Sequence, residues 1–149
     1  TEAEFTVVKQ HPVRGEDLLR DAAAQTDDSF LSTASDIAYS HHEKWNGSGY
    51  PQGLAGPQIP LAGRIVAIVD VYDALISERP YKRPFSHQES VDIIKANSGT
   101  HFDPYLVSVF LRHTDDFVRI GGGLCQTGEA MPPLGVAAHG SAIPRYTKQ

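Results

Sequence analysis

The sequence predicts an all-α bundle followed by a tail rich in glycine and proline. Two observations lead to this fold class: apolar residues recur at helical spacing in several segments, and capping residues or prolines precede those segments. In addition, the sequence has no β-hairpin signal and no internal repeat. The 149 residues suit one domain, predicted over residues 1–118, with residues 119–149 predicted to be a flexible tail or linker.

The predicted helices begin at recognisable signals. Thr1 with Glu4, and Ser86 with Glu89, have the spacing of a capping box, in which two side chains satisfy backbone N–H groups. Pro12 suits a first helical turn, where its missing N–H costs nothing. The helices predicted from such signals and from periodicity cover about residues 1–11, 12–23, 29–42, 60–77, 86–99 and 103–110.

A long loop is predicted between the third and fourth helices, over residues 43–59. Its density of glycine and proline is typical of a functional connection rather than a plain one. In the helix before it, periodicity places His41 on the inner face near the C-terminal end, in line with Phe30 and Ile37. The loop is therefore expected to begin beside a histidine that faces the interior.

Composition excludes several classes of protein. A net charge of −5 disfavours a broad surface for duplex nucleic acid, although a few basic side chains can still hold a small anion. The only cysteine, Cys125, excludes an internal disulfide and a thiolate-rich zinc cluster. No apolar run approaches the roughly 18 residues of a membrane span, and no signal peptide is recognisable. A cytoplasmic location is therefore the default expectation.

Four residues are candidate metal ligands: His11, His41, His42 and Asp70. Histidines beside a proline or at a helix end are often simple surface or capping residues. Asp70 is harder to explain in this way, because it lies in an apolar helix, where a buried carboxylate needs a cationic partner or a metal. Imidazole and carboxylate without thiolate favour iron, manganese or zinc in a hydrolytic site.

The spacing of the candidates suggests more than one role. Consecutive helical residues point about 100° apart, so His41 and His42 are expected to serve two ions, or one ion and its ligand, rather than one ion side by side. Two metal ions can hold a hydroxide for in-line attack at phosphorus. Asp73 lies one turn after Asp70 and is either a group for proton transfer or a surface charge.

A basic cluster follows the same helix. Arg79 and Lys82 are either a solvated cationic helix end or a phosphate clamp, with Arg79 forking onto two oxygens and Lys82 acting as a point charge. Along the helix, Arg79 lies roughly 13–14 Å beyond Asp70. That reach favours the clamp and a ligand longer than one phosphate.

The stretch HHEKWNGSGYP, residues 41–51, closely resembles the signature of the HD-GYP family. The similarity covers about residues 1–112 and includes the turn around His101 and Asp103, which are expected to shape it and to cap the last helix. The resemblance implies an HD-domain-like helical bundle with two or three divalent metal ions, iron or manganese, that hydrolyses cyclic di-GMP to a linear dinucleotide or GMP. The family's metal ligands match His11, His41, His42 and Asp70, and its dinucleotide contacts match Tyr50, Arg79 and Lys82.

The sequence departs from the family in one respect. No histidine is followed by aspartate, whereas the family carries a His-Asp pair and a catalytic lysine on an earlier helix. These are expected upstream of Thr1, in a longer protein with a receiver or sensory domain. The 149 residues alone are therefore expected to have an incomplete metal site and little or no hydrolytic activity. A homodimer is one arrangement left open.

Two other functions remain compatible with the sequence. The first is a module that binds a cyclic dinucleotide or a partner protein without hydrolysing anything, which the missing His-Asp pair favours. The second is a phosphohydrolase for a different nucleotide. That alternative shares the metal chemistry but leaves the Gly49-Tyr50-Pro51 motif unexplained.

Overall fold

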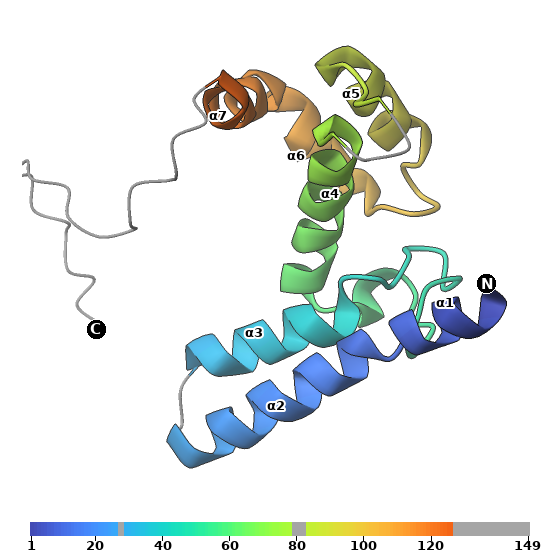
Figure 1. The fold of residues 1–149 in the computed structure, drawn as a ribbon, viewed down its shortest axis with the longest axis vertical. Coiled ribbons are helices and arrows are strands. Elements are labelled where there is room, and N and C mark those ends of the chain that lie inside the picture. The colour runs from blue at the N-terminus through green and yellow to red at the C-terminus, as the bar shows by residue number, and fades with distance from the viewer. Residues whose placement is uncertain (27–28, 79–82, 127–149) are drawn as a thin grey trace, which may run out of the picture. The chain divides into compact units, whose positions relative to one another are not determined.

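A computed structural model of the chain describes residues 1–26, 29–78 and 83–126 (Figure 1). Helices are the regular elements of these residues, with two isolated β-bridges between loop residues, which confirms the all-α prediction. The chain divides into two units, Thr1–Asp115 and Asp116–Gln149. The elements are α1 (Glu2–Val8), α2 (His11–Thr26), α3 (Ser29–Ser40), the 3-10 turn η1 (Gly56–Gln58), α4 (Leu61–Ile76), α5 (His87–Ala96), α6 (Pro104–Arg112) and α7 (Thr114–Gln126).

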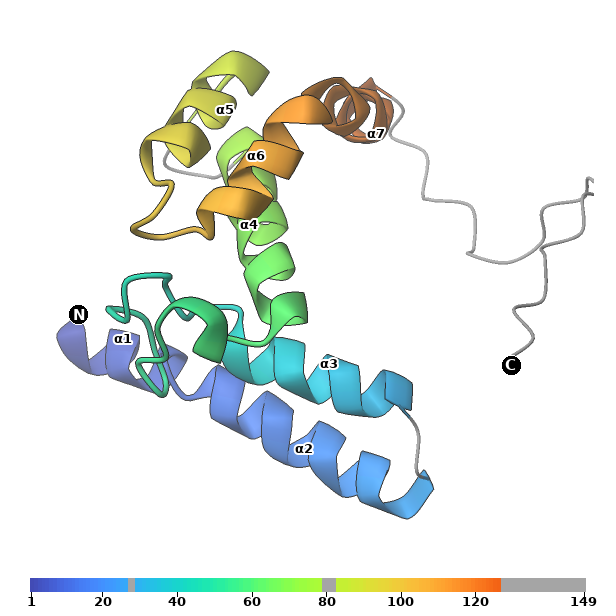
Figure 2. The ribbon, with the colours of Figure 1, turned by 180° about the vertical axis from the view of Figure 1, so that it is seen from behind.

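Within the first unit, α2 and α3 form an antiparallel pair (Figures 1 and 2). They approach closely at Gly15, where an added Cβ would lie 3.4 Å from the Cβ of Ala38. Helix α4 packs against α3, α5 and α6. The start of α2 consequently lies beside the end of α3, and α4 links this pair to the rest of the unit.

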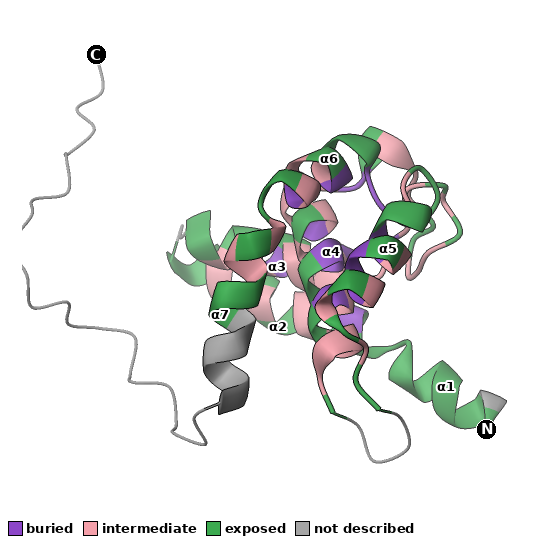
Figure 3. Cartoon of the chain, turned by 90° about the horizontal axis from the view of Figure 1, so that it is seen from above, coloured by how far each residue is buried: buried purple, intermediate pink, exposed green. Residues whose placement is uncertain are grey.

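The core gathers around α4, as the buried residues in Figure 3 show. Every residue of α1 whose burial is described is instead exposed. The hydroxyl of Tyr72 on α4 lies 2.9 Å from Nδ1 of His87 on α5, which joins the two helices inside this core. The buried apolar residues are Ile59, Ala67, Ile68, Tyr72, Val91, Ile94, Phe102, Val107 and Phe110.

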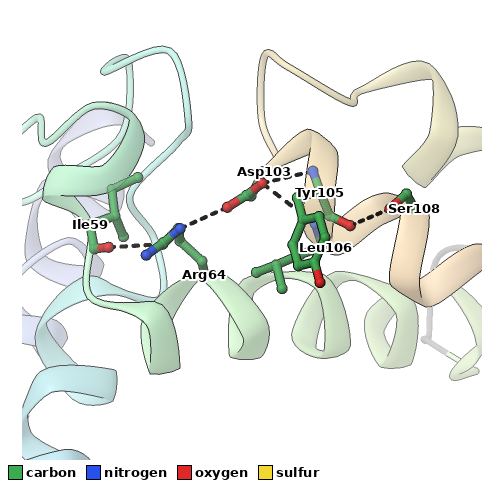
Figure 4. Close-up of polar contacts among 6 residues, drawn as sticks. All are labelled: Ile59, Arg64, Asp103, Tyr105, Leu106 and Ser108. Atoms are coloured by element: carbon green, nitrogen blue, oxygen red, sulfur yellow. Dashed lines mark hydrogen bonds and ion pairs between the residues drawn. The ribbon is translucent and has the colours of Figure 1, made fainter.

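An ion pair between half-buried Arg64 and buried Asp103 joins the beginnings of α4 and α6 (Figure 4). Arg64 donates from its guanidinium to Asp103 at 2.7 Å and from Nε to the carbonyl of Ile59 at 2.9 Å. The other carboxylate oxygen of Asp103 accepts from the N–H of Tyr105 at 2.8 Å, which confirms Asp103 as the cap of this helix. Separating the two helix starts would break this ion pair and leave an uncompensated charge. The pair therefore holds the beginnings of α4 and α6 together.

The expected burial of Asp70 is wrong. Asp70 is exposed, and Val69 beside it is 43% exposed. The core side of α4 carries Ala67, Ile68 and Tyr72. At about 100° per residue, Asp70 points roughly 200° away from Ile68 and so emerges on the other side of the helix.

Several predicted boundaries also differ from the structure. The capping boxes at Thr1 and Ser86 are confirmed, but the first helix ends at Val8 and the third at Ser40. The inner-face position expected for Phe30 is wrong, because Phe30 is 75% exposed. Capping depends on neighbours in sequence, whereas burial depends on elements that are distant in sequence. Burial is therefore harder to predict.

Helix α7 was not predicted. The expectation that helical periodicity ends before residue 119 is wrong, because α7 continues to Gln126 through the glycine run. Glycine in a helix costs about 1 kcal/mol but does not forbid it, and Arg119 pairs with Asp116 one turn earlier at 2.9 Å. The domain boundary at residue 118 and the tail stay predictions, and residues 127–149 lie outside the described part. In that part, no helix has both the length and the apolar character needed to cross a membrane.

Candidate metal centre

Three histidines from two neighbouring helix ends come together in space. His11 is the first residue of α2, and His41 and His42 directly follow the last residue of α3. Nε2 of His11 lies 3.3 Å from Nε2 of His41 and 3.1 Å from Nε2 of His42. One ligand atom from each ring lies within 4.8 Å of the others. The antiparallel pairing of α2 and α3 therefore brings together three of the four predicted metal ligands.

Backbone carbonyls fix the protonation of two of these rings. Nδ1 of His11 lies 2.7 Å from the carbonyl oxygen of Val8, and Nδ1 of His41 lies 3.0 Å from that of Ile37. A carbonyl oxygen can only accept, so both Nδ1 atoms carry the proton. In the neutral rings, both Nε2 atoms are then unprotonated, and their lone pairs face each other at 3.3 Å. This arrangement is unfavourable unless a cation shares the lone pairs.

The cluster fits a divalent transition-metal ion. Ligand nitrogens about 2.1 Å from such an ion, at angles between square and tetrahedral, lie roughly 3.0–3.4 Å apart. The separations of 3.1 and 3.3 Å fall within this range. Ligating histidines also commonly donate their other ring N–H to a backbone carbonyl, as His11 and His41 do here.

The expectation that His41 and His42 point apart is wrong. Their ring centroids are 4.1 Å apart and the ring planes are tilted by 38°. The expectation assumed that both residues lie on a regular helix, whereas α3 ends at Ser40. The chain turns after that residue, so the 100° rule no longer applies.

His42 is unprotonated at neutral pH. Burial, followed by the neighbouring charges of His41 and His11, lowers the pKa of His42 from 6.5 to about 4. The negative charge of Asp70 acts against this shift but is outweighed. A metal ligand must be deprotonated to bind, so His42 needs to lose no proton for that role.

The two aspartates of α4 lie outside the histidine cluster. Asp70 is exposed and is not among the three grouped residues. Its charge nevertheless opposes the lowering of the His42 pKa and adds to the raising of the Tyr50 pKa. It is thus close enough to act on the site through its field. Asp73 lies one turn further along α4 and is also exposed. The ligand role of Asp70 and the proton-transfer role of Asp73 stay predictions.

Tyr50 covers one side of the cluster. Its ring stacks on that of His42, with centroids 4.8 Å apart and planes 28° apart. Burial, with a smaller contribution from Asp70, raises the pKa of the Tyr50 phenol, so this group stays protonated and can donate a hydrogen bond. The ammonium of Lys9 lies 5.6 Å from the centre of the Tyr50 ring, a contact that sequence reasoning missed. The predicted clamp residues Arg79 and Lys82 lie outside the described residues.

Comparison with known proteins identifies the family. Residues 1–106 match the HD domain family. The chain belongs to this family. The predicted resemblance to HD-GYP proteins is confirmed, because relatives of the chain are cyclic di-GMP phosphodiesterases.

Relatives of this HD domain include phosphodiesterases of cyclic dinucleotides. A cyclic di-GMP phosphodiesterase of Vibrio cholerae is 51% identical over 80% of this chain and 25% of its own length. A 3'3'-cGAMP-specific phosphodiesterase 2 of the same organism is 40% identical over 81% of this chain and 22% of its own length. The crystal structure of a cyclic GMP-AMP specific phosphodiesterase of V. cholerae shares 32% identity, with a TM-score of 0.52 over 72% of this chain and 24% of that one. The chain thus spans about a quarter of the relatives that it matches.

Sequence reasoning missed the role of a buried carboxylate that comes directly after the histidine pair of this HD domain. Glu43 follows His42 in the chain and is only 2% exposed. Its oxygens accept hydrogen bonds from the backbone of the loop that carries Tyr50. The sequence signal for this role was the position of a charged residue between a histidine pair and a glycine-rich loop. Such a loop leaves many N–H groups without helical partners, and a carboxylate can accept hydrogen bonds from them.

The low pKa of His42 predicts acid sensitivity of the metal-free HD domain. Between pH 6.5 and about 4 the unfolded chain binds a proton at His42 more readily than the folded one. The contribution of His42 to stability is therefore fully present above pH 6.5 and is lost as the pH falls through 4. We expect urea unfolding to show decreasing stability over this window, and His42→Ala to show a shallower decrease. Equal pH dependence in both proteins would contradict the assignment; His101, whose pKa burial also lowers, leaves a residual slope.

Proposed function

We propose that the chain is part of a metal-dependent phosphodiesterase that hydrolyses cyclic di-GMP or a related cyclic dinucleotide to a linear dinucleotide or GMP. The observation that carries this proposal is the convergence of three histidine Nε2 atoms, two of them with lone pairs directed by backbone carbonyls. The names of the relatives support the substrate class.

The proposed ligands are His11, His41, His42 and Asp70, and iron or manganese suits their imidazole and carboxylate groups. Two or three bound ions would supply a hydroxide nucleophile at neutral pH and neutralise charge on a phosphodiester. The protein contributes by lowering the pKa of His42 and by fixing the ring orientations of His11 and His41 through backbone carbonyls. The exposed carboxylate of Asp73 is a proposed acceptor or donor of protons, because solvent reaches it directly.

The substrate would lie against the tyrosine side of the cluster. The Tyr50 ring offers a face for stacking and a phenol O–H for a phosphate oxygen. Lys9, beside this ring, supplies a positive charge. Arg79 and Lys82 are proposed to hold the second phosphate, as the length of a dinucleotide requires.

The chain is proposed to work within a longer protein. It covers 25% of the Vibrio cholerae cyclic di-GMP phosphodiesterase, and its own sequence has no His-Asp pair. We propose that the missing ligands lie upstream, together with a receiver or sensory domain. A homodimer and a cytoplasmic location stay predictions.

Asp70→Ala is expected to weaken metal affinity about 10- to 100-fold, as the loss of a supporting or direct ligand does. Metal content per chain, measured by elemental analysis after dialysis, checks this result. Asp92→Ala removes another exposed carboxylate, on α5, and serves as the control. Equal metal content in the two variants would remove Asp70 from the ligand set.

Hydrolysis by the longer protein tests the proposed function. The protein is loaded anaerobically with iron or manganese and given cyclic di-GMP or 3'3'-cGAMP, and the products are separated by chromatography. Metal-dependent turnover of either substrate supports the proposal, and the ratio of the two rates gives the specificity. A folded, metal-loaded protein that binds but does not cleave them would instead be the non-hydrolytic module that the absent His-Asp pair favours.

A further inference from the structure

Glu43 is a buried carboxylate that accepts three hydrogen bonds from the backbone of one loop. Its Oε1 accepts from the N–H of Gln52 at 2.7 Å and of Gly53 at 3.1 Å, and its Oε2 accepts from the N–H of Leu54 at 3.0 Å. A buried charge is stable only when such bonds replace water. The side chain is 2% exposed, so neither oxygen is available to a metal ion or a substrate.

The same loop is fixed to the backbone on either side of Glu43. The N–H of Tyr50 donates to the carbonyl of His42 at 3.3 Å. Gly49 lies so close that an added Cβ would be 2.5 Å from the Cα of Glu43, a distance that real Cβ atoms do not show. Residues 49–54 therefore fold back onto His42 and Glu43, with the Glu43 carboxylate inside the fold.

We propose that Glu43 is a positioning residue that holds Tyr50 against His42 by anchoring the backbone of residues 52–54. Tyr50 makes its stacking contact from a loop, and a loop is set in place only by its own contacts. The carboxylate supplies three of these contacts, to the residues two, three and four positions after the tyrosine. Only the consequence for substrate binding rests on the proposed function, because it requires that Tyr50 contacts the dinucleotide.

Glutamine cannot replace Glu43 in this role. Its amide keeps one accepting oxygen but puts an NH₂ donor where the other oxygen was. In one orientation the NH₂ faces the N–H of Leu54, and in the other it faces those of Gln52 and Gly53. Either way, at least one hydrogen bond is lost and two donors oppose each other.

Amide hydrogen exchange tests the anchor without any catalytic assay. In metal-loaded Glu43→Gln, the amides of Gln52, Gly53 and Leu54 are expected to exchange at least about 10-fold faster than in the wild type, because their bonds to a charged acceptor are lost or weakened. The amide of Tyr50, which donates to the carbonyl of His42, is expected to exchange faster as well, because the loop that holds it is released. Glu89→Gln is the matched control: its carboxylate accepts from the backbone N–H of Ser86 in a capping box, where glutamine is tolerated. Unchanged exchange at these four amides in Glu43→Gln would overturn the proposal.

Kinetics with the dinucleotide then separates positioning from general stability. Glu43→Gln is expected to raise KM roughly 10-fold with unchanged metal content, because Tyr50 would no longer be held in place. Loss of metal together with kcat would show a structural role and overturn the proposal. If Glu43→Gln does not fold, Glu43→Asp, which keeps the charge on a shorter side chain, is expected to give the same changes to a smaller degree. If the wild type hydrolyses no cyclic dinucleotide, the proposed function fails, while the exchange result still decides the anchor.

Discussion

Replacing His42 with alanine is expected to remove bound metal and to lower hydrolysis by at least about 100-fold, since even loss of a residue that supports a ligand costs 10- to 100-fold. Nε2 of His42 lies 3.1 Å from Nε2 of His11, and its pKa of about 4 leaves it unprotonated at neutral pH. Of the three rings, His42 also carries the stacked Tyr50. Its loss therefore affects both the metal side and the substrate side of the site.

Elemental analysis and hydrolysis rates in the longer protein measure the effect of His42→Ala. His113→Ala, which changes an exposed histidine at the end of α6, is the control and is expected to keep metal and activity. Far-UV circular dichroism establishes that both variants are folded. If His42→Ala retained the metal content of the control, His42 would not be a ligand, and the convergence of the three nitrogens would need another explanation.

The second large effect concerns the contact between α3 and α4. Gly63 on α4 is buried against Ser40, the last residue of α3. A Cβ at Gly63 would lie 3.0 Å from the Cβ of Ser40 and 3.3 Å from its carbonyl carbon, and closer still to its hydroxyl oxygen. Ser40 is 1% exposed and donates its hydroxyl to the carbonyl of Asp36, so it has no room to move away.

Gly63→Ala is therefore expected to destabilise the protein by roughly 1–3 kcal/mol, as overpacking of a core does. Gly15→Ala is the matched control, because its Cβ would meet that of Ala38 at 3.4 Å, an ordinary van der Waals distance. In a helix, alanine is favoured over glycine by about 0.5–1 kcal/mol, so this variant is expected to be more stable than the wild type. Urea unfolding measures both.

The two glycine variants differ in their effect on the metal site as well. Gly63→Ala would displace the end of α3, which leads into His41 and His42, from the helix that carries Asp70. Weaker metal binding is thus expected along with the lower stability. Equal stabilisation by both substitutions would contradict the close approach of α3 and α4 at Ser40.

Signals that act between neighbours in sequence predicted much of the fold. The capping boxes at Thr1 and Ser86 and the cap at Asp103 involve side chains that bond to nearby backbone, so their spacing is sufficient. The exposure of Asp70 could not be predicted in this way, because it depends on which side of α4 meets α5 and α6. Helix α7 was missed because a run of glycines lowers helix propensity without abolishing it.

The candidate site shows the same division. The histidines were found from the sequence, but the approach of the His41 and His42 rings follows from a helix end two residues earlier than predicted. Lys9 and Glu43 were not assigned roles, because both act through loop residues that are distant in sequence. Arg79 and Lys82 stay predictions, since the described residues end at 78 and resume at 83.

The hydrogen bond from Nδ1 of His11 to the carbonyl of Val8 has a consequence for metal affinity. Val8 is the last residue of α1, and His11 is the first of α2, so the ring is oriented by the break between two helices. The conformational entropy of the imidazole is therefore lost when the helices form, so ion binding does not have to bear this cost. Heat or a mutation in α1 that unfolds the end of this helix would release the His11 ring. Affinity for the ion would then fall, although every ligand is still present in the chain.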